Sequence, residues 1–249
     1  SSLDPKIRGT IQAPAEFKEM YPPVENLFKE GTKYGEKAMV PTSEARQRDF
    51  RAAVTCMDAS IGKLLDCLDR KGLKENTIVL FFSDNGGGGG SSNYPLRGGK
   101  ARTWEGGIRV LALARWPSGG IPAGTVNDAF LTSLELFPSL AAATGSKLPE
   151  DVKIDGYNWW ATLRGETESP RNEMFWKRKG RKSARIGNWK WVDMEEEGGG
   201  LFDLSNDIGE RNDLSTQHPE VLKRIKQRFD EWYQETMFFA EPRGPFKDF

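Results

Sequence analysis

An amphipathic pattern between residues 42 and 71 is the first long signal in the chain. Thr42 or Ser43 can cap the start of a helix there, and Gly72 ends it. Residues 1–40 lack this period and contain several prolines, which predicts an irregular surface segment with at most one short helix. Apolar residues recur in the predicted helix at spacings of three and four, at Phe50, Ala53, Val54, Met57, Ile61, Leu64, Leu65 and Leu68.

Continuous apolar runs follow this helix. Residues 77–83 read Thr-Ile-Val-Leu-Phe-Phe-Ser, as expected of an inner strand that is covered on both faces. A second strand is predicted at 108–115. A helix is predicted at about 132–144, where Gly145 closes it. Helices and buried strands in this order predict an α/β fold.

The pattern changes after residue 150. Short β-prone segments alternate with Gly, Lys and Asn, which predicts an antiparallel meander over 173–176, 183–186, 190–192 and 200–203. A last amphipathic helix is expected at about 219–236, with one apolar face formed by Val221, Leu222, Ile225, Phe229, Trp232 and Tyr233. We therefore expect a boundary between residues 1–149 and a small α+β subdomain at 150–249.

Composition narrows the function classes. The 249 residues include 36 basic and 36 acidic side chains, so the net charge is zero and gives no electrostatic argument for a nucleic-acid partner. The sequence has no apolar run that approaches membrane-spanning length, so no membrane partner is expected. From the first residues, Ser1 to Asp4, no signal peptide is expected within this stretch of sequence.

Candidate chemistry is concentrated in residues 79–110. The predicted strand at 77–83 leads directly to Asp84 and Asn85, whose oxygens suit a hard cation such as calcium or magnesium. Lys100 follows within twenty residues and supplies a positive charge for an oxyanion. Each has a plainer alternative, because Asp and Asn also favour turns and a lone lysine is often only a solvated charge. Glu105 is expected to pair structurally with Arg97 or Arg109.

The same stretch resembles the sulfatase family. The likeness lies in Ser83-Asp84-Asn85-Gly86, then Leu96-Arg97-Gly98-Gly99-Lys100, then Trp104-Glu105-Gly106-Gly107-Ile108-Arg109-Val110, after which Leu111 replaces the family's proline. It extends upstream through residues 53–65 and downstream through 201–214, so it covers most of residues 11–236 in family order.

This resemblance implies a fold and an activity. The fold would be part of a mixed, largely parallel central sheet with flanking helices, followed by the small antiparallel C-terminal subdomain. The activity would be hydrolysis of a sulfated small molecule or glycan, with Asp84 and Asn85 as ligands of Ca²⁺ (or Mg²⁺) and Lys100 as a sulfate contact. A hydrated formylglycine would attack sulfur. The family location would be periplasmic, secreted or lysosomal.

Two catalytic parts of the family pattern are missing from this sequence. Neither Cys56 nor Cys67 stands in the Cys/Ser-x-Pro-x-Arg motif that yields formylglycine, and Arg8 falls about where the family has a histidine. His218, the only histidine, lies beside Pro219 as a plausible cap or surface residue. The chain therefore looks like the C-terminal half of a sulfatase. We expect it to be inactive without the missing N-terminal half as its partner.

Three alternatives stay open at this stage. The parent protein could be a phosphoester or phosphonate hydrolase of the wider alkaline-phosphatase-like superfamily, which the identity of the nucleophile would decide. The chain could also be a non-catalytic remnant or binding module. Finally, the basic and Trp-rich run from Trp176 to Trp191 could be packed sheet with its basic side chains reaching solvent, or a rim that contacts an anionic glycan.

Overall fold

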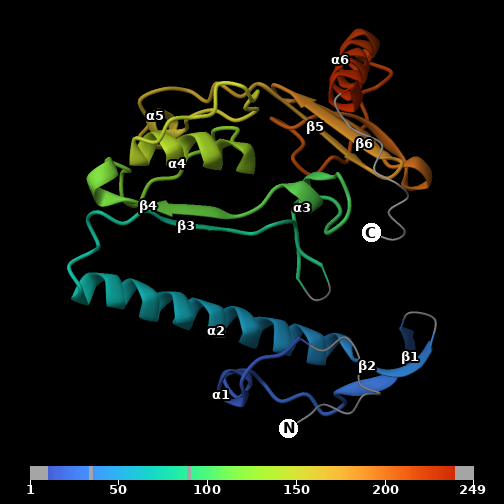
Figure 1. The fold of residues 1–249 in the computed structure, drawn as a ribbon. Coiled ribbons are helices and arrows are strands. Elements are labelled where there is room, and N and C mark those ends of the chain that lie inside the picture. Colours follow the sequence, from blue (N-terminus) through green and yellow to red (C-terminus); the bar gives the residue numbers. More distant parts are fainter. Residues whose placement is uncertain (1–10, 34–35, 89–90, 239–249) are drawn as a thin grey trace. The chain divides into compact units, whose positions relative to one another are not determined.

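The computed structural model describes residues 11–33, 36–88 and 91–238 (Figure 1). The chain forms two compact units. One is built mainly from the chain up to Val79, and the other from Leu80–Gly86, Asn93–Arg115 and the chain from Gly119 onward. The domain boundary at residue 150 stays a prediction. None of the described helices combines the length and apolar character of a membrane span.

The first unit begins with a short helix and a hairpin. Helix α1 spans Ala15–Lys18, and strands β1 (Phe28–Lys33) and β2 (Glu36–Pro41) pair antiparallel. The prediction of at most one short helix agrees with α1, but the prediction of irregular structure is wrong for the hairpin. The physical reason is that β1 reads Phe-Lys-Glu-Gly-Thr-Lys, so it has almost no apolar alternation and gains its strand conformation from hydrogen bonds to β2.

Helix α2 spans Ser43–Arg70, close to the predicted 42–71. The hydroxyl oxygen of Thr42 accepts a hydrogen bond from the Ala45 amide at 3.3 Å, which confirms Thr42 as the cap. Gly72 adopts a φ of +66°, so the chain leaves the helix in a left-handed conformation. Asp49, on the buried side of α2, pairs with Lys18 at 3.2 Å and so ties α1 to α2.

The predicted strands at 77–83 and 108–115 appear as β3 (Val79–Phe82) and β4 (Ala112–Arg115). Within the described part of the chain they form a two-stranded sheet with each other. The expected inner position of β3 in a large, largely parallel sheet is therefore not met here. The apolar run of β3 is only half-buried because a single partner strand leaves much of it uncovered.

A second group of elements connects β4 to the last sheet. It contains η1 (Pro117–Gly119), η2 (Ser133–Glu135), α4 (Leu136–Thr144) and α5 (Trp160–Leu163). Together η2 and α4 match the predicted helix at 132–144, and Gly145 closes it with a φ of +68°. Buried Glu135 hydrogen-bonds to the Thr132 hydroxyl at 2.9 Å and to the Arg171 Nε at 2.9 Å, which fixes this helix to the start of the next sheet.

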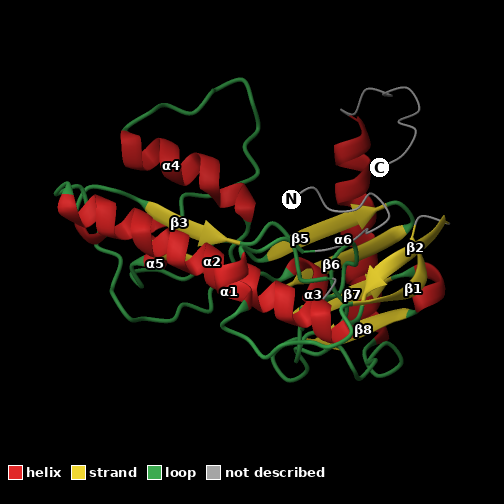
Figure 2. Ribbon diagram, turned by 90° about the horizontal axis from the view of Figure 1, so that it is seen from below, coloured by secondary structure: helices red, strands yellow, loops and turns green. Residues whose placement is uncertain are grey.

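The predicted meander and last helix are confirmed. The strands of the meander are β5 (Glu173–Arg178), β6 (Arg181–Ile186), β7 (Trp189–Asp193) and β8 (Gly199–Asp203). They pair in the order β5-β6-β7-β8 and are antiparallel throughout. A single turn, η3 (Glu195–Glu197), joins β7 to β8. Helix α6 (Pro219–Phe238) lies over one face of the sheet (Figure 2).

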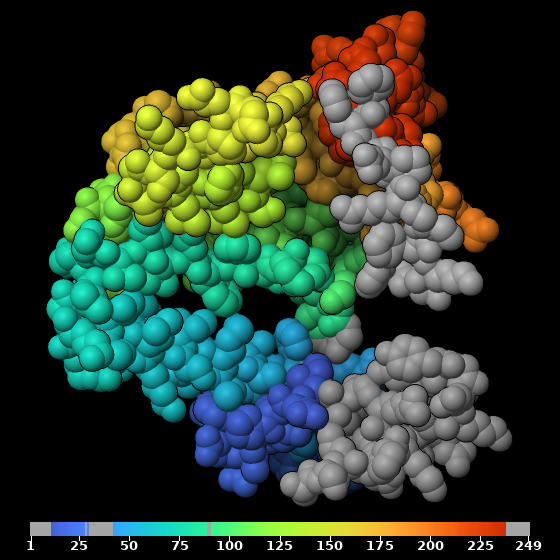
Figure 3. Space-filling view, viewed as in Figure 1, coloured from blue at the N-terminus to red at the C-terminus, as the bar shows by residue number. Residues whose placement is uncertain are grey.

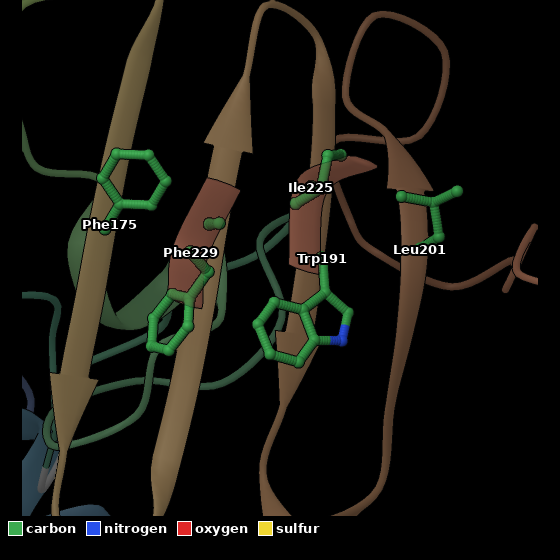
Figure 4. Close-up of a cluster of buried hydrophobic side chains, with 6 residues drawn as sticks. Phe175, Trp191, Leu201, Ile225 and Phe229 are labelled. Carbon is green, nitrogen blue, oxygen red and sulfur yellow. The ribbon is translucent and has the colours of Figure 1, made fainter. Parts of the chain in front are cut away.

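The core of the second unit lies between α6 and this sheet, and Figure 3 shows α6 (red) against the sheet (orange and brown). Phe229 contacts the ring of Trp191 edge-on at 5.4 Å between centroids. Figure 4 labels Phe175, Trp191 and Leu201 of the strands together with Ile225 and Phe229 of α6. The buried members are Phe175, Ala184, Trp191, Leu201, Ile225 and Phe229.

Candidate active site

Asp84 and Asn85 follow the end of β3 after one residue, Ser83, close to the predicted position. Asp84 is exposed and Asn85 is half-buried, and the Ser83 hydroxyl donates to the Asn85 carbonyl at 2.8 Å. The next residue, Gly86, is buried against helix α3 (Glu105–Ile108), where its amide donates to the Gly107 carbonyl at 3.0 Å. A methyl group on Gly86 would lie 1.8 Å from the Gly106 carbonyl oxygen, so only glycine fits this approach.

Lys100 is exposed and follows a loop that packs on the same short helix. The Gly106 amide donates to the Arg97 carbonyl at 2.7 Å, and a methyl group on Gly107 would lie 2.6 Å from the Gly99 carbonyl oxygen. Backbone contacts therefore bring the segment after Asn85 and the segment before Lys100 against the same two glycines. The assignment of these side chains to a site stays a prediction.

The loop around Lys100 is also anchored to the C-terminal sheet. Ala101 adopts a φ of +73°, a conformation that costs an alanine energy and persists only where neighbouring contacts impose it. One such contact is the Arg181 Nη1, which donates to the Ala101 carbonyl at 2.9 Å. Arg102 pairs with Glu197 at 2.6 Å on the surface. The conformation next to Lys100 is thus held in part by Arg181, eighty positions away.

Glu105 has the structural role expected of it. Its carboxylate is buried and accepts a hydrogen bond from the Arg109 Nε at 2.8 Å, which confirms one of the two predicted partners. Arg97, the other predicted partner, instead donates to the Glu210 carbonyl at 3.0 Å and lies over the Trp104 ring at 3.7 Å. A third cation was not foreseen: the Lys190 Nζ lies 2.8 Å from the Glu105 carboxylate.

Lys190 and Glu210 complete a buried ionic cluster. The Lys190 side chain is 0% exposed, and its Nζ also lies 2.8 Å from the Glu210 carboxylate, which is equally enclosed. Burial raises the pKa of Glu210, and the nearby Lys190 ammonium offsets only part of that, so the pKa stays above its ordinary value. Burial also acts on Glu105, but Lys190 and Arg109 together outweigh it and lower the pKa of that carboxyl.

The remaining predicted positions are distributed as follows. His218 precedes α6 and contacts the Trp189 ring at 4.8 Å between centroids. In the basic and Trp-rich run, Trp191 is buried under α6 and Lys177 lies over the Tyr233 ring at 4.3 Å, as expected of packed sheet. Arg8 lies outside the described residues. Within the described ranges, no three His, Cys, Asp or Glu side chains gather as a metal site.

Lys190 and Glu210 were not identified from the sequence. A signal for Lys190 was present, because this lysine interrupts the otherwise apolar Trp189-Lys190-Trp191-Val192 and must point to the face opposite Trp191. A buried lysine requires an acidic partner. Nothing in the spacing identified that partner as Glu105, which lies 85 residues earlier, so this pairing follows only from the tertiary structure.

Comparison with known proteins places these features in a family context. The sulfatase family model matches residues 13–146. Steryl-sulfatase of Rattus norvegicus is 39% identical over 131 residues, covering 49% of this chain and 22% of the rat protein. Arylsulfatase A of Homo sapiens is 34% identical over 209 residues, covering 69% and 40% respectively.

Among solved structures, Ps i-CgsB in complex with k-i-k-neocarrahexaose is similar, with a TM-score of 0.76 and 28% identity. The match covers 90% of this chain and 47% of that protein. The chain therefore spans less than half the length of each of these three relatives.

Proposed function

Because the chain belongs to the sulfatase family, we propose that the complete protein hydrolyses sulfate esters and that this chain supplies its cation- and sulfate-contacting loops. One observation carries the proposal. Gly86, next to Asn85, packs against Gly106 and Gly107 of α3, and Gly99, next to Lys100, packs against Gly107. This packing supports a common site for the candidate ligands and the candidate sulfate contact.

The cation in this proposal is Ca²⁺, with Mg²⁺ as the second possibility. The donor chemistry fits, since Asp84 offers an exposed carboxylate and Asn85 an amide oxygen, and both are hard ligands. Because Ca²⁺ takes six to eight oxygens, these two residues form only part of a site. A bound divalent cation supplies positive charge that polarises a sulfate oxygen. Asp84 and Asn85 act by holding it at the end of β3.

Lys100 is proposed to contact a sulfate oxygen. Negative charge increases on these oxygens as the ester bond breaks, and a fixed ammonium group stabilises that charge. The left-handed Ala101 and the Arg181 contact support a loop that is held in place before substrate arrives. An exposed Lys100 side chain is compatible with access for substrate.

The nucleophile is proposed to come from outside this chain. The family typically uses formylglycine, but Cys56 and Cys67 are half-buried within α2 and lack the modification motif, so they do not fit this role. The residues of this chain would bind and orient the ester, and the attack on sulfur would need a group from the rest of the protein. We therefore propose that the isolated chain is inactive.

The partner of this chain is proposed to be the remaining half of the enzyme. The β3–β4 sheet carries exposed apolar side chains at Phe82 (42%) and Leu113 (58%), and Leu111 (63%) lies just before β4. The sheet has only two strands among the described residues. Exposed apolar side chains and open strand edges favour association. Additional strands from the other half of the enzyme would cover these apolar side chains and pair with the open strand edges. This accounts for the small sheet seen where a large one was expected.

The substrate class is proposed to be a sulfated small molecule or glycan. Steryl-sulfatase and arylsulfatase A support small sulfate esters by their names, while Ps i-CgsB was solved with a hexaose. Because these names include both small esters and a glycan, the assay begins with a generic aryl sulfate.

The experiment compares this chain and the complete protein in an aryl sulfate assay with Ca²⁺, with phosphate and phosphonate monoesters in parallel. We expect sulfate turnover by the complete protein and none by the chain alone. Preferential turnover of phosphate or phosphonate esters would replace the proposal with the alternative superfamily activity. No hydrolysis of any ester by the complete protein would identify a non-catalytic relative. Turnover by the chain alone would refute its incompleteness.

A further inference from the structure

We propose that Glu210 is a positioning residue, which fixes the α3 turn so that the loops carrying Asp84, Asn85 and Lys100 adopt one geometry. The inference deepens the proposed function and rests on it for the identity of the reaction. The observation behind it is independent, because it concerns how a buried carboxylate from the C-terminal region holds a turn about one hundred residues earlier.

Glu210 contacts three separate elements. Its carboxylate accepts a hydrogen bond from the Glu105 amide at 2.6 Å, at the start of α3, and lies 2.8 Å from the Lys190 Nζ. Its carbonyl accepts from the Arg97 Nη1 at 3.0 Å. Glu210 thus contacts the loop before Lys100, helix α3 after that loop, and the inner strand β7.

The two contacts of the Glu210 carboxylate are buried. Glu210 and Lys190 are both 0% exposed. A carboxylate in such a place interacts more strongly than a surface one, because water neither screens it nor competes for its hydrogen bonds. Glu210 also adopts a φ of +51°, uncommon for a residue with a side chain, so its conformation is imposed by the contacts around it.

Backbone hydrogen bonds connect the turn to the candidate site. The Gly106 amide binds the Arg97 carbonyl, and the Gly86 amide binds the Gly107 carbonyl. A change in the orientation of the turn would therefore move Asn85 on one side and Lys100 on the other. Glu210 does not need to touch substrate to affect turnover, because a misplacement of about 1 Å at a reacting group can cost two orders of magnitude in rate.

Exposed contacts to the same loop provide a contrast. Glu197 binds Arg102 at 2.6 Å and Arg181 at 2.8 Å, but its side chain is 34% exposed. Surface ion pairs contribute little because solvent screens them. The geometry therefore assigns the positioning role to the buried carboxylate of Glu210 and not to Glu197, which makes Glu197 a matched control.

The experiment measures hydrogen exchange and steady-state kinetics on the complete protein with Glu210→Gln and Glu197→Gln. In Glu210→Gln we expect amide exchange in residues 84–88 and 97–109 to rise at least tenfold, while residues 183–192 of the sheet stay protected. Turnover should fall at least tenfold with KM changed less than threefold. Glu197→Gln should change each quantity less than threefold.

Two results would overturn the positioning role. The first is unchanged exchange in 84–88 and 97–109, and the second is an equal rise throughout the sheet, which indicates a general structural role only. If Glu210→Gln does not fold, Arg97→Met removes the contact to the Glu210 carbonyl and is judged by the same criteria. Exchange is read without substrate, so an inactive wild type would refute the sulfatase proposal and leave the positioning test decisive.

Discussion

The two faces of the β5–β8 sheet are buried by different kinds of contact. The face under α6 is apolar, with Trp191 and Leu201 enclosed by Ile225 and Phe229. The opposite face combines a small apolar cluster around Trp104 and Phe202 with the ionic group centred on Lys190. Trp191 and Lys190 are neighbours in β7, so one strand contributes to both faces.

The comparison indicates which face of the sheet depends on particular partner side chains. Apolar contacts are non-directional, so the α6 face depends on volume and tolerates exchange between similar side chains. The ionic face depends on particular partners, because a buried charge that loses its counter-charge is strongly destabilising. It is the ionic face that holds the turn next to the candidate site. We therefore expect a sharp contrast between substitutions on the two faces.

The largest effect is expected for Lys190→Met. Methionine has a similar length, but it leaves the buried Glu105 and Glu210 carboxylates without their shared cation. The expected loss is about 3–5 kcal/mol in the free energy of unfolding, as for other broken buried ion pairs. Urea denaturation of the complete protein measures it. A loss below about 1 kcal/mol would mean that the ionic cluster contributes no specificity.

The matched substitution on the other face is Leu201→Met. Leu201 is also 0% exposed. It lies in β8 opposite Trp191, which follows Lys190 in β7. Because leucine and methionine have similar volumes, the free energy of unfolding should fall by less than about 1.5 kcal/mol. The same urea titration reports it. Equal losses for Leu201→Met and Lys190→Met would remove the distinction between the two faces.

A smaller effect is expected in the pH dependence of stability. The raised pKa of Glu210 means that the folded protein holds this proton more tightly than the unfolded chain, whose carboxyl has the ordinary value of 4.5. This contribution to stability is present below pH 4.5 and is lost as pH rises through the folded pKa. Glu210→Gln should remove this part of the slope.

The check is a set of urea midpoints for wild type and Glu210→Gln from pH 4 upward. The urea midpoint of wild type relative to that of Glu210→Gln should be highest at the acidic end and should decrease as pH rises. Glu197→Gln provides the reference, since the pKa of Glu197 is lowered, chiefly by the hydrogen bond from Arg102, and its slope has the opposite sign. A slope difference of the same sign for both variants would contradict the assignment.

The contrast between the faces also explains how much the sequence could predict. Helix α2, with its Thr42 cap, and α6, with its apolar stripe, followed from local periodicity. The meander followed from short β-prone segments between turns. The β1–β2 hairpin did not, because its stability comes from pairing and not from an apolar pattern.

The candidate site was predictable only in part. Asp84, Asn85 and Lys100 were identified from residue chemistry and from family resemblance, while the packing of their neighbours Gly86 and Gly99 against α3 required the tertiary structure. Lys190 and Glu210 act across 85 to 113 residues of sequence through single side-chain contacts. Such contacts leave no periodic signal, so local patterns do not reveal them.

The most direct test of the account is the effect of Lys100→Ala on sulfate ester hydrolysis by the complete protein. The control is Lys223→Ala, at an exposed position of α6. Loss of a preorganised charge at the sulfate predicts a fall in kcat of about a hundredfold or more. Lys223→Ala should retain wild-type turnover. A fall of less than threefold for Lys100→Ala would make Lys100 an ordinary surface charge and contradict the proposed site.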